Sequence, residues 1–528
     1  MYIHLMLIPD YLVQHSLKWF SVYQGINFPA TDGFLKLREH PFPQNAAVCQ
    51  AANPAYLCGM QSYPFPKAFI ARLQAHFPDQ AETILDAMQE PPVLSIRQNP
   101  LKGSACFESE EPVPWNPHGR YLQDRPPYVL DPLHHAGAYY VQEASSMLFA
   151  NAIDFKPGML MLDLCAAPGG KSTLLLSQLQ PESLLISNEL VHERAQVLKE
   201  NLVRWGYPQV MVTNNRTDAF TAFNGIFDVV VVDAPCSGEG MFRKDSKAAE
   251  LWSEGLVKRC AHDQREMLQH AVDLVKPGGM LIFSTCTFEA EENEANVQSL
   301  YEVFGNILQP ALLPLQPDWG VKERLVETAQ GGHPVYYCLP GLVRGEGMFI
   351  SCFRKTGEGM MSRPRPKGRS LMALSSAEME TIQEYYSESE ALSVVKEEDE
   401  AYALPAAFLP LVSQMWQKLK VLKPGLHLGS FKHGKFVPSH ELAMSLSLSE
   451  KIPVVALDKE QSLKYLSRES FPLPDLGFKG WGIVRYEHLP LGWIKNLGNR
   501  FNIHFPAQYK IRLDVERYQE HLDDKRKG

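Results

Sequence analysis

Two cysteines stand in short loops of small and polar residues, where a thiol could serve as a nucleophile. Cys286 lies in a Ser-Thr-Cys-Thr string at residues 284–287, and Cys236 lies in Asp-Ala-Pro-Cys-Ser-Gly at residues 233–238. Each loop follows an apolar run that is typical of a buried strand. Open α/β sheets carry their chemistry at the carboxyl ends of strands, so both thiols stand where covalent catalysis would need them.

A cysteine is nevertheless more often a small buried hydrophobic residue than a catalytic group. That interpretation suits Cys260, Cys338 and Cys352. It suits Cys236 and Cys286 poorly, because each follows one of two adjacent predicted strands and stands among small polar residues. We therefore treat these two as the candidate catalytic pair.

A glycine-containing loop joins a predicted strand to a predicted helix over residues 161–172. Its centre consists of Cys165, Ala166, Ala167, Pro168, Gly169, Gly170 and Lys171. Two adjacent glycines let the backbone approach a ligand closely, and the helix N-terminus that follows favours an electronegative group. The glycine that opens a P-loop is missing at the required spacing, which argues against ATP.

Glu189 directly follows the next predicted strand, at residues 184–188. An acid at this place in a nucleoside-binding sheet can bind ribose hydroxyls. The alternative is a surface glutamate that caps the next helix. The position at the strand end and the preceding glycine loop together favour binding of a ribose.

The segment that carries these residues alternates apolar runs with helical stretches. The runs are residues 159–164, 184–188, 210–213, 227–232, 280–284 and 348–353, and the helical stretches are residues 172–179, 192–204 and 263–274. The first five runs are continuously apolar, as a parallel sheet covered on both faces requires. The pattern predicts a doubly wound α/β domain.

Three strings, taken in chain order, resemble the Fmu/Sun family of RNA (cytosine-5)-methyltransferases. They are Cys-Ala-Ala-Pro-Gly-Gly-Lys-Ser at residues 165–172 and the two cysteine strings at residues 233–238 and 284–287. Residues 95–99 and 142–146 extend the likeness toward the N-terminus.

Two further strings narrow the resemblance. Residues 238–245 and 492–500 resemble the branch that methylates 16S ribosomal RNA in bacteria. This implies an α/β fold, a Rossmann-like class I methyltransferase sheet with an N-terminal α+β subdomain and a small C-terminal PUA-like α+β module. The implied cofactor is S-adenosylmethionine, and the implied partner is RNA, as ribosomal RNA or the small ribosomal subunit.

The resemblance also implies a role for each site residue. Cys286 would add to carbon 6 of a cytosine, which makes carbon 5 nucleophilic enough to take a methyl group. Cys236 would assist release afterwards, and Asp233 would neutralise charge at ring nitrogen 3 and border the cofactor. Residues 165–171 would face the methionine and ribose parts of the cofactor, with Glu189 on the ribose.

One position departs from the family pattern. Members have an aspartate after the third strand that contacts adenine. Ungapped counting back from Asp228 puts Asn215 at that place, whereas Asp218 restores the acid only by a shift. The adenine contact is therefore open between these two residues.

Composition and punctuation suggest six segments. They are an extension at residues 1–59 (a small extra domain, a mobile arm or sequence ahead of a start at Met60), an N-terminal α+β RNA-binding subdomain at 60–157, the methyltransferase domain at 158–355, a linker at 356–400, a PUA-like RNA-binding module at 401–515 and a tail at 516–528.

The net charge of −9 shows that the chain is not a polycation. RNA binding must then use local basic patches. The candidates are Arg97, Arg243, Lys244 and the basic, aromatic residues 493–510. Because the target base must leave its stack to reach Cys286, a single-stranded or melted segment is favoured over intact duplex.

Nine cysteines without a Cys-x-x-Cys pair argue against a zinc site or a disulfide framework. No apolar run approaches the ~20 residues that span a bilayer, and the first residues lack the basic region of a signal peptide. We expect a cytoplasmic monomer that binds neither membrane nor metal.

Three other interpretations compete. The same reaction could act on transfer RNA. A DNA cytosine methyltransferase would instead use Cys236, of the Pro-Cys pair, as the nucleophile and leave Cys286 idle. An RNA-binding ribosome-assembly factor with a degenerate methyltransferase domain would lack affinity for S-adenosylmethionine; the complete set of motifs argues against it.

Overall fold

A computed structural model of the chain describes residues 64–103, 107–357 and 371–512. The extension at residues 1–59 and the tail at 516–528 lie outside the described residues. Within the described ranges, no helix has the length and apolar character needed to cross a membrane.

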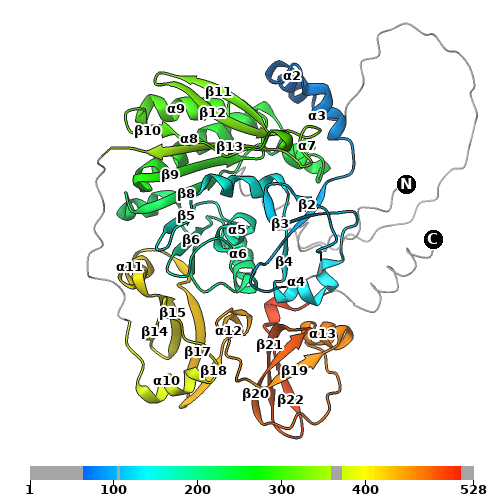
Figure 1. Ribbon diagram of the computed structural model, residues 1–528, viewed down its shortest axis with the longest axis vertical. Coiled ribbons are helices and arrows are strands. Elements are labelled where there is room, and N and C mark those ends of the chain that lie inside the picture. Colours follow the sequence, from blue (N-terminus) through cyan, green and yellow to red (C-terminus); the bar gives the residue numbers. More distant parts are fainter. Residues whose placement is uncertain (1–63, 104–106, 358–370, 513–528) are drawn as a thin grey trace, which may run out of the picture. The chain divides into compact units, whose positions relative to one another are not determined.

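The core of the molecule is a ten-stranded sheet in the order β11-β12-β13-β9-β8-β5-β6-β7-β16, with β10 paired to β13 (Figure 1). Its parallel strands are β5 (Leu160–Asp163), β6 (Leu184–Asn188), β7 (Val210–Thr213), β8 (Phe227–Asp233) and β9 (Val275–Thr285). The helices that connect or flank them are α5 (Gly170–Leu176), α6 (His192–Trp205), α7 (Ser246–Leu251), α8 (Glu254–Leu274) and α9 (Glu294–Phe304). The predicted doubly wound α/β domain is confirmed.

The continuous apolar runs form these strands because both faces of the sheet are covered. Val230, Val231 and Val232 of β8 are each 0% exposed. Burial on both faces removes the need for alternating polarity. Since the five strands run parallel, the loops that follow β5, β6, β8 and β9 emerge at one edge of the sheet.

Antiparallel strands extend the sheet beyond β9. They are β13 (Met348–Lys355), β12 (Gly331–Cys338), β11 (Lys322–Thr328) and β10 (Leu308–Pro310). Only β13 has the continuous apolar run that predicts a buried strand. Strands β10 and β12 contain Pro, and β11 is rich in charged residues, so their sequences carry a weaker strand signal.

The N-terminal part has the expected α+β character. Its elements are α2 (Lys67–His76), α3 (Ala81–Ala87), α4 (Pro132–Ala136) and a sheet in the order β2-β3-β1-β4 made of β2 (Pro112–Val113), β3 (Asn116–Leu122), β1 (Leu94–Gln98) and β4 (Tyr139–Val141). The amphipathic stretches at residues 65–77 and 81–89 predict helices α2 and α3 to within a few residues.

Arg97 of β1 connects this part to the central sheet. Its guanidinium donates from Nε to Gln142 Oε1 at 2.8 Å and from Nη2 to Thr173 Oγ1 at 2.6 Å. It also lies 4.6 Å from the ring centroid of Trp205. Because the residue is 1% exposed, the expectation that Arg97 contacts RNA is wrong. Its donors are used to hold the first turn of α5.

The segment expected to be a linker, residues 356–400, is largely folded where it is described. It contains α10 (Ser376–Gln383) and β14 (Leu392–Glu397), which pairs with β15 (Glu400–Pro405). Glu398, at a φ of 53°, lies in the tight turn between these strands. The acidic run at residues 397–400 is therefore a hairpin turn, not a solvated linker; residues 358–370 lie outside the described chain.

The C-terminal part contains two small sheets. The first has the order β14-β15-β17-β18, with β17 (Leu426–Lys432) and β18 (Lys435–Pro438); the second has the order β19-β20-β21-β22, with β19 (Val454–Leu457), β20 (Gly480–Tyr486), β21 (Leu489–Asn496) and β22 (Phe501–His504). The associated helices are α11 (Leu409–Lys418), α12 (His440–Met444) and α13 (Lys459–Leu466). The module expected at 401–515 thus contains most of the first sheet, without β14, and the whole of the second.

A short strand of this C-terminal part completes the central sheet. Strand β16 (Val421–Lys423) pairs antiparallel with β7, and Val421 lies opposite Thr213. The Asn214 amide N–H donates to the Lys420 carbonyl at 2.9 Å. The open edge of the parallel sheet is therefore covered by residues that lie about 200 positions later in the chain.

Replacing Arg97 by Met should lower the free energy of unfolding by about 3 kcal/mol, because the buried acceptors on Gln142 and Thr173 lose a charged donor. Urea titration followed by circular dichroism measures this. The control is Arg125→Met, since Arg125 is exposed and its change should stay within about 0.5 kcal/mol. Equal effects of the two substitutions would contradict the assignment.

Candidate active site

The two candidate thiols meet at the carboxyl edge of the central sheet. Strands β8 and β9 are parallel neighbours, and Asp233 lies opposite Ser284 in their register. Loops that start side by side bring Cys236 Sγ to 3.3 Å from Cys286 Sγ. Both residues are partly exposed. The structure therefore brings together the two cysteines singled out from the sequence.

The surroundings of Cys236 favour its protonated form. Its hydrogen bond with Cys286 raises the pKa of Cys236 well above the ordinary value, and burial and the charge of Glu292 act in the same direction. Either sulfur could be the donor in the contact between the two residues. A protonated thiol is a poor nucleophile, so the raised pKa argues against Cys236 as the attacking group.

Lys171 and Asp233 form an ion pair beside the thiols. Lys171 Nζ lies 2.7 Å from Asp233 Oδ2, and the Ser284 hydroxyl donates to Asp233 Oδ1 at 2.8 Å. Burial acts to lower the pKa of Lys171, but the Asp233 carboxylate outweighs it and raises that pKa, and Cys286 contributes in the same sense. Lys171 is thus a permanent cation that faces the catalytic cluster.

The glycine-containing loop lies between β5 and α5 and is held from behind by α6. Arg194 donates to the Ala167 carbonyl at 2.9 Å, and Asn201 donates to the Pro168 carbonyl at 2.7 Å. Gly169 has a φ of 118°, which side chains rarely allow, and an added Cβ would come within 3.3 Å of Leu198. Glycine is therefore required here, and the loop presents bare backbone.

Two buried carboxylates at this loop each have one oxygen that accepts no hydrogen bond among the described residues. Asp163 is fully buried, and Oδ2 accepts from the Ser172 hydroxyl at 2.7 Å, whereas Oδ1 has no hydrogen-bond partner among the described residues. Burial raises the pKa of Asp163 to about 7. Buried acceptors without donors usually have a ligand or water to satisfy them.

Glu189 supplies the second such oxygen. Its Oε1 accepts from the Val191 amide at 2.9 Å. Its Oε2 lies 3.2 Å from Arg194 Nη1, but accepts no hydrogen bond within the described part of the chain. Spare acceptors beside a bare backbone loop fit a ligand that carries amino and hydroxyl donors, as S-adenosylmethionine does.

The two candidates for the adenine contact lie outside this cluster. The Asn215 side chain is engaged by the C-terminal part, because its Nδ2 donates to the Lys420 carbonyl at 3.1 Å and its Oδ1 accepts from the Lys420 amide at 3.0 Å. Asp218 is exposed, and Oδ2 lies 3.4 Å from Arg216 Nε. The structure thus assigns Asn215 to the junction with β16.

A group of buried polar residues behind the thiol loops has no counterpart in the sequence predictions. Its members are Ser237, Glu239, Gln264, Thr287 and Glu292. Glu292 belongs to a Glu-Glu-Asn-Glu string at residues 291–294, which is typical of a solvated helix start. The one sequence pattern that could have indicated this buried group is the Gly-Glu-Gly string at residues 238–240, which directly follows a cysteine loop.

The basic residues expected to bind RNA divide into exposed and buried ones. Lys244 is exposed. The Arg243 side chain is 7% exposed, because Nη2 lies 3.6 Å from Glu90 and Nη1 lies 3.9 Å from Glu346. Trp493 is 1% exposed and donates from Nε1 to the Ser439 carbonyl at 2.7 Å. Free contact with RNA was therefore wrongly expected for Arg243 and Trp493.

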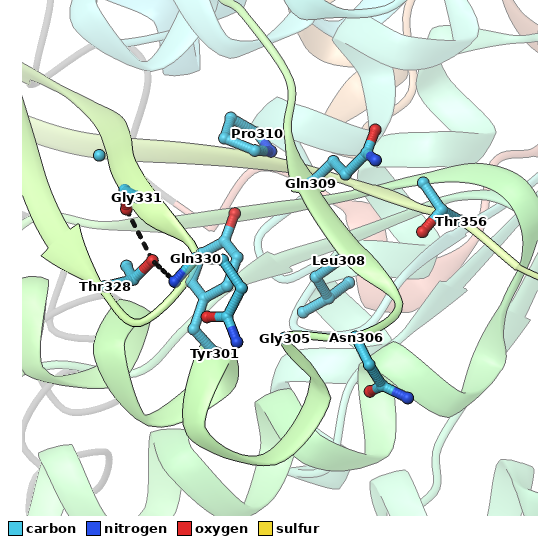
Figure 2. A pocket seen from close by; sticks show the side chains of 11 residues that line it. Tyr301, Gly305, Asn306, Leu308, Gln309, Pro310, Thr328, Gln330, Gly331 and Thr356 are labelled. Atoms are coloured by element: carbon cyan, nitrogen blue, oxygen red, sulfur yellow. Dashed lines mark hydrogen bonds between the residues drawn. The ribbon is translucent and has the colours of Figure 1, made fainter.

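One pocket lies elsewhere, between the end of α9, β10 and the turn joining β11 to β12 (Figure 2). Its wall includes Tyr301, Leu308 and Thr328, whose hydroxyl donates to the Gly331 carbonyl at 2.7 Å. None of the candidate active-site residues lines this pocket. This pocket is therefore separate from the candidate active site.

Models of four known protein families match the chain. The chain matches the family models described as 16S rRNA methyltransferase RsmB/F at residues 150–354, the N-terminal domain of 16S rRNA methyltransferase RsmF at 65–144, the RsmF rRNA methyltransferase first C-terminal domain at 382–446 and the methyltransferase RsmF PUA domain at 452–511.

Similar curated proteins carry one name. Ribosomal RNA small subunit methyltransferase F of Shewanella oneidensis is 31% identical over 460 residues, which cover 82% of this chain and 94% of the relative. The protein of that name from Aliivibrio fischeri is 30% identical over 473 residues, covering 84% and 97%. A solved methyltransferase homologue from Pyrococcus horikoshii is 28% identical, with a TM-score of 0.48, covering 55% of this chain and 96% of its own.

The parallel sheet, the glycine loop and the family models together define a class I methyltransferase with appended N- and C-terminal domains. The identity and coverage of the relatives then allow a narrower assignment. The chain belongs to the ribosomal RNA small subunit methyltransferase F family.

Iodoacetamide at pH 8 should alkylate Cys286 before Cys236, because the raised pKa of Cys236 keeps it a thiol and the thiolate is the reactive form. Peptide mapping by mass spectrometry over a time course measures both rates. The buried residues Cys260, Cys338 and Cys352 serve as internal controls that should react last. Faster alkylation of Cys236 would contradict the assignment of the nucleophile.

Proposed function

We propose that the chain transfers a methyl group from S-adenosylmethionine to carbon 5 of a cytosine in 16S ribosomal RNA, through a covalent adduct with Cys286. The observation that carries the proposal is the pair of thiols 3.3 Å apart, beside the partly buried ammonium of Lys171 and next to a bare glycine loop. The names of the family and of the relatives supply the RNA. We place the reaction in the cytoplasm.

The cofactor, when bound, supplies an electrophilic methyl group. The loop of residues 165–170 would pass its backbone along the cofactor, with the N-terminus of α5 near the carboxylate of the methionine part. Asp163 Oδ1 and Glu189 Oε2, which accept no hydrogen bond among the described residues, would accept from its amino and hydroxyl groups. We leave the adenine contact unassigned, because the Asn215 side chain bonds to Lys420.

Cys286 begins the reaction by adding its sulfur to carbon 6 of the base. The electrons of the former double bond between carbons 5 and 6 then make carbon 5 the nucleophile that takes the methyl group. The Lys171 ammonium, paired with Asp233, supplies positive charge beside the reacting groups. Addition also places negative charge on ring nitrogen 3, which the Asp233–Lys171 pair can neutralise.

Release completes the cycle. Water takes the proton from carbon 5, the electrons of that bond re-form the double bond between carbons 5 and 6, and the Cys286 sulfur leaves carbon 6 as a thiolate. We assign assistance of this step to Cys236, whose sulfur is 3.3 Å from that of Cys286 and therefore close to the bond that breaks. The base must be unstacked to reach this depth, which favours a single-stranded or melted RNA segment.

Replacing Cys286 by Ala should abolish methyl transfer, because no adduct can form at carbon 6. Replacing Cys236 by Ala should leave addition intact and slow release, so that a covalent protein–RNA complex accumulates. Incorporation of tritiated methyl groups into 16S RNA and denaturing gels of the reaction mixture measure the two effects. The cysteine-to-alanine change at the buried residue Cys352 is the matched control.

The opposite pattern would overturn this division of roles. If Cys236→Ala abolished transfer while Cys286→Ala retained it, Cys236 would be the nucleophile. A lack of measurable affinity for both S-adenosylmethionine and S-adenosylhomocysteine would favour a non-catalytic RNA-binding protein. Bisulfite mapping of ribosomal and transfer RNA from a deletion strain would identify the modified nucleotide.

A further inference from the structure

Two glutamates lie fully buried directly behind the thiol loops. Glu239 and Glu292 are each 0% exposed, and neither forms an ion pair with any residue that the structure describes. Both carboxyls contact the same hydroxyl, that of Ser237. Two ionised carboxyls in this arrangement would bury two negative charges without a cation, which is strongly unfavourable.

The donors around the pair show how the charge is divided. Glu239 accepts from the Phe288 amide at 3.2 Å and from the indole N–H of Trp252, so both of its oxygens face donors. Ser237 Oγ lies 2.7 Å from Glu239 Oε1 and also contacts Glu292 Oε1. A hydroxyl has one proton to give. If it donates to Glu239, the contact with Glu292 is a hydrogen bond only when Glu292 carries a proton.

We propose that Glu292 is a neutral positioning residue, whose proton is donated to Ser237 Oγ while the Ser237 hydroxyl donates to the Glu239 carboxylate. This chain of hydrogen bonds fixes the two thiol loops against each other. Its effect on methyl transfer rests on the proposed function; its existence does not.

These hydrogen bonds reach both thiol loops through backbone groups. On one side, Ser237 follows Cys236, and its amide N–H donates to Glu292 Oε2 at 3.2 Å. On the other side, Glu239 accepts from Phe288, two residues after Cys286. Ionisation of Glu292 would remove the central hydrogen bond and add a second buried charge. The spacing of the two sulfurs would then lose its support.

Neighbouring elements hold Glu292 without supplying a compensating charge. Gln264 of α8 donates to Glu292 Oε2 at 2.7 Å and to the Pro235 carbonyl at 2.8 Å, so it extends the chain to the residue before Cys236. An amide donor can serve a neutral or an ionised carboxyl. It adds a contact to the Cys236 loop while leaving the charge of the pair unchanged.

The other titratable groups that face the pair are Cys236, Cys260 of α8, and Glu289. Arg72 of α2 is bound to Glu289, with Nη2 2.6 Å from Oε2. Burial, followed by the charge of Glu239, raises the pKa of Glu292 to about 9.

The first test is the pH dependence of stability. A carboxyl that titrates near 4.5 when unfolded and near 9 when folded binds more protons in the folded state across that window. Wild-type stability contributed by this group therefore falls as the pH rises from about 5 to 9. Glu292→Gln, whose amide N–H replaces the carboxyl proton, removes the titration, so its Tm should rise relative to wild type by several degrees across this range.

The matched control for stability is Glu302→Gln, an exposed glutamate of α9. Its Tm should follow that of wild type at every pH. If the difference between Glu292→Gln and wild type stays constant from pH 5 to 9, Glu292 is ionised throughout and the proposal is overturned. Since Tm requires no RNA or cofactor, this outcome is independent of the proposed reaction.

The second test concerns the thiols. Glu292→Gln should keep the methyl-transfer rate within about threefold of wild type. Glu292→Ala and Glu239→Gln should each lower kcat at least tenfold, because each interrupts the series of hydrogen bonds between the two thiol loops. Glu239→Gln is the more informative variant, because the NH2 group of glutamine would face N–H and O–H donors that the Glu239 carboxylate accepts from. The rate of Cys286 alkylation should change in the same order.

Equal losses for Glu292→Gln and Glu239→Gln would overturn the assignment of the proton to Glu292. If wild type transfers no methyl group but the pH test and the alkylation order hold, the proposed function fails and the inference about Glu292 stands. If wild type is active and Glu292→Ala matches it in both kcat and alkylation, the positioning role is refuted.

Discussion

The parallel register of β8 and β9 is the constraint on which the site depends. Asp233 and Ser284 end these strands side by side, so each loop begins at the same height above the sheet. A shift of one residue would turn the side chains to the other face and separate the two sulfurs. Backbone pairing of β8 with β9 over Val229–Asp233 fixes that register. Strand pairing thus sets the distance between the two candidate catalytic sulfurs.

A second theme is the way in which buried charge is handled around the site. Arg97 is buried without a carboxylate and is satisfied by neutral acceptors and an aromatic face. Lys171 and Asp233 neutralise each other at the partly exposed mouth of the site. Removing either partner would leave the charge of the other uncompensated, so these groups resist substitution singly.

The sequence predicted the sheet and both thiols because those features are local. Continuous apolar runs indicate buried strands, and Cys236 and Cys286 follow two of them directly. It could not predict the contacts of the Asn215 side chain, since the partner Lys420 directly precedes a strand that is distant in the sequence. Glu292 was missed because an acidic string normally faces water, and only tertiary contacts with Ser237 reveal its burial.

The pairing of β16 with β7 has a consequence for how the domains can be separated. An uncovered edge strand presents unpaired backbone groups and invites association with other chains. Here that edge ends at Asn214 and Asn215, and Asn214 also donates to the carbonyl of Glu189 at 2.8 Å. The border between catalytic and C-terminal domains therefore runs through a shared sheet. A catalytic fragment that ends before residue 420 would leave the edge of β7 unpaired and prone to associate with other chains. A fragment that ends after residue 423 would keep β16 paired with β7.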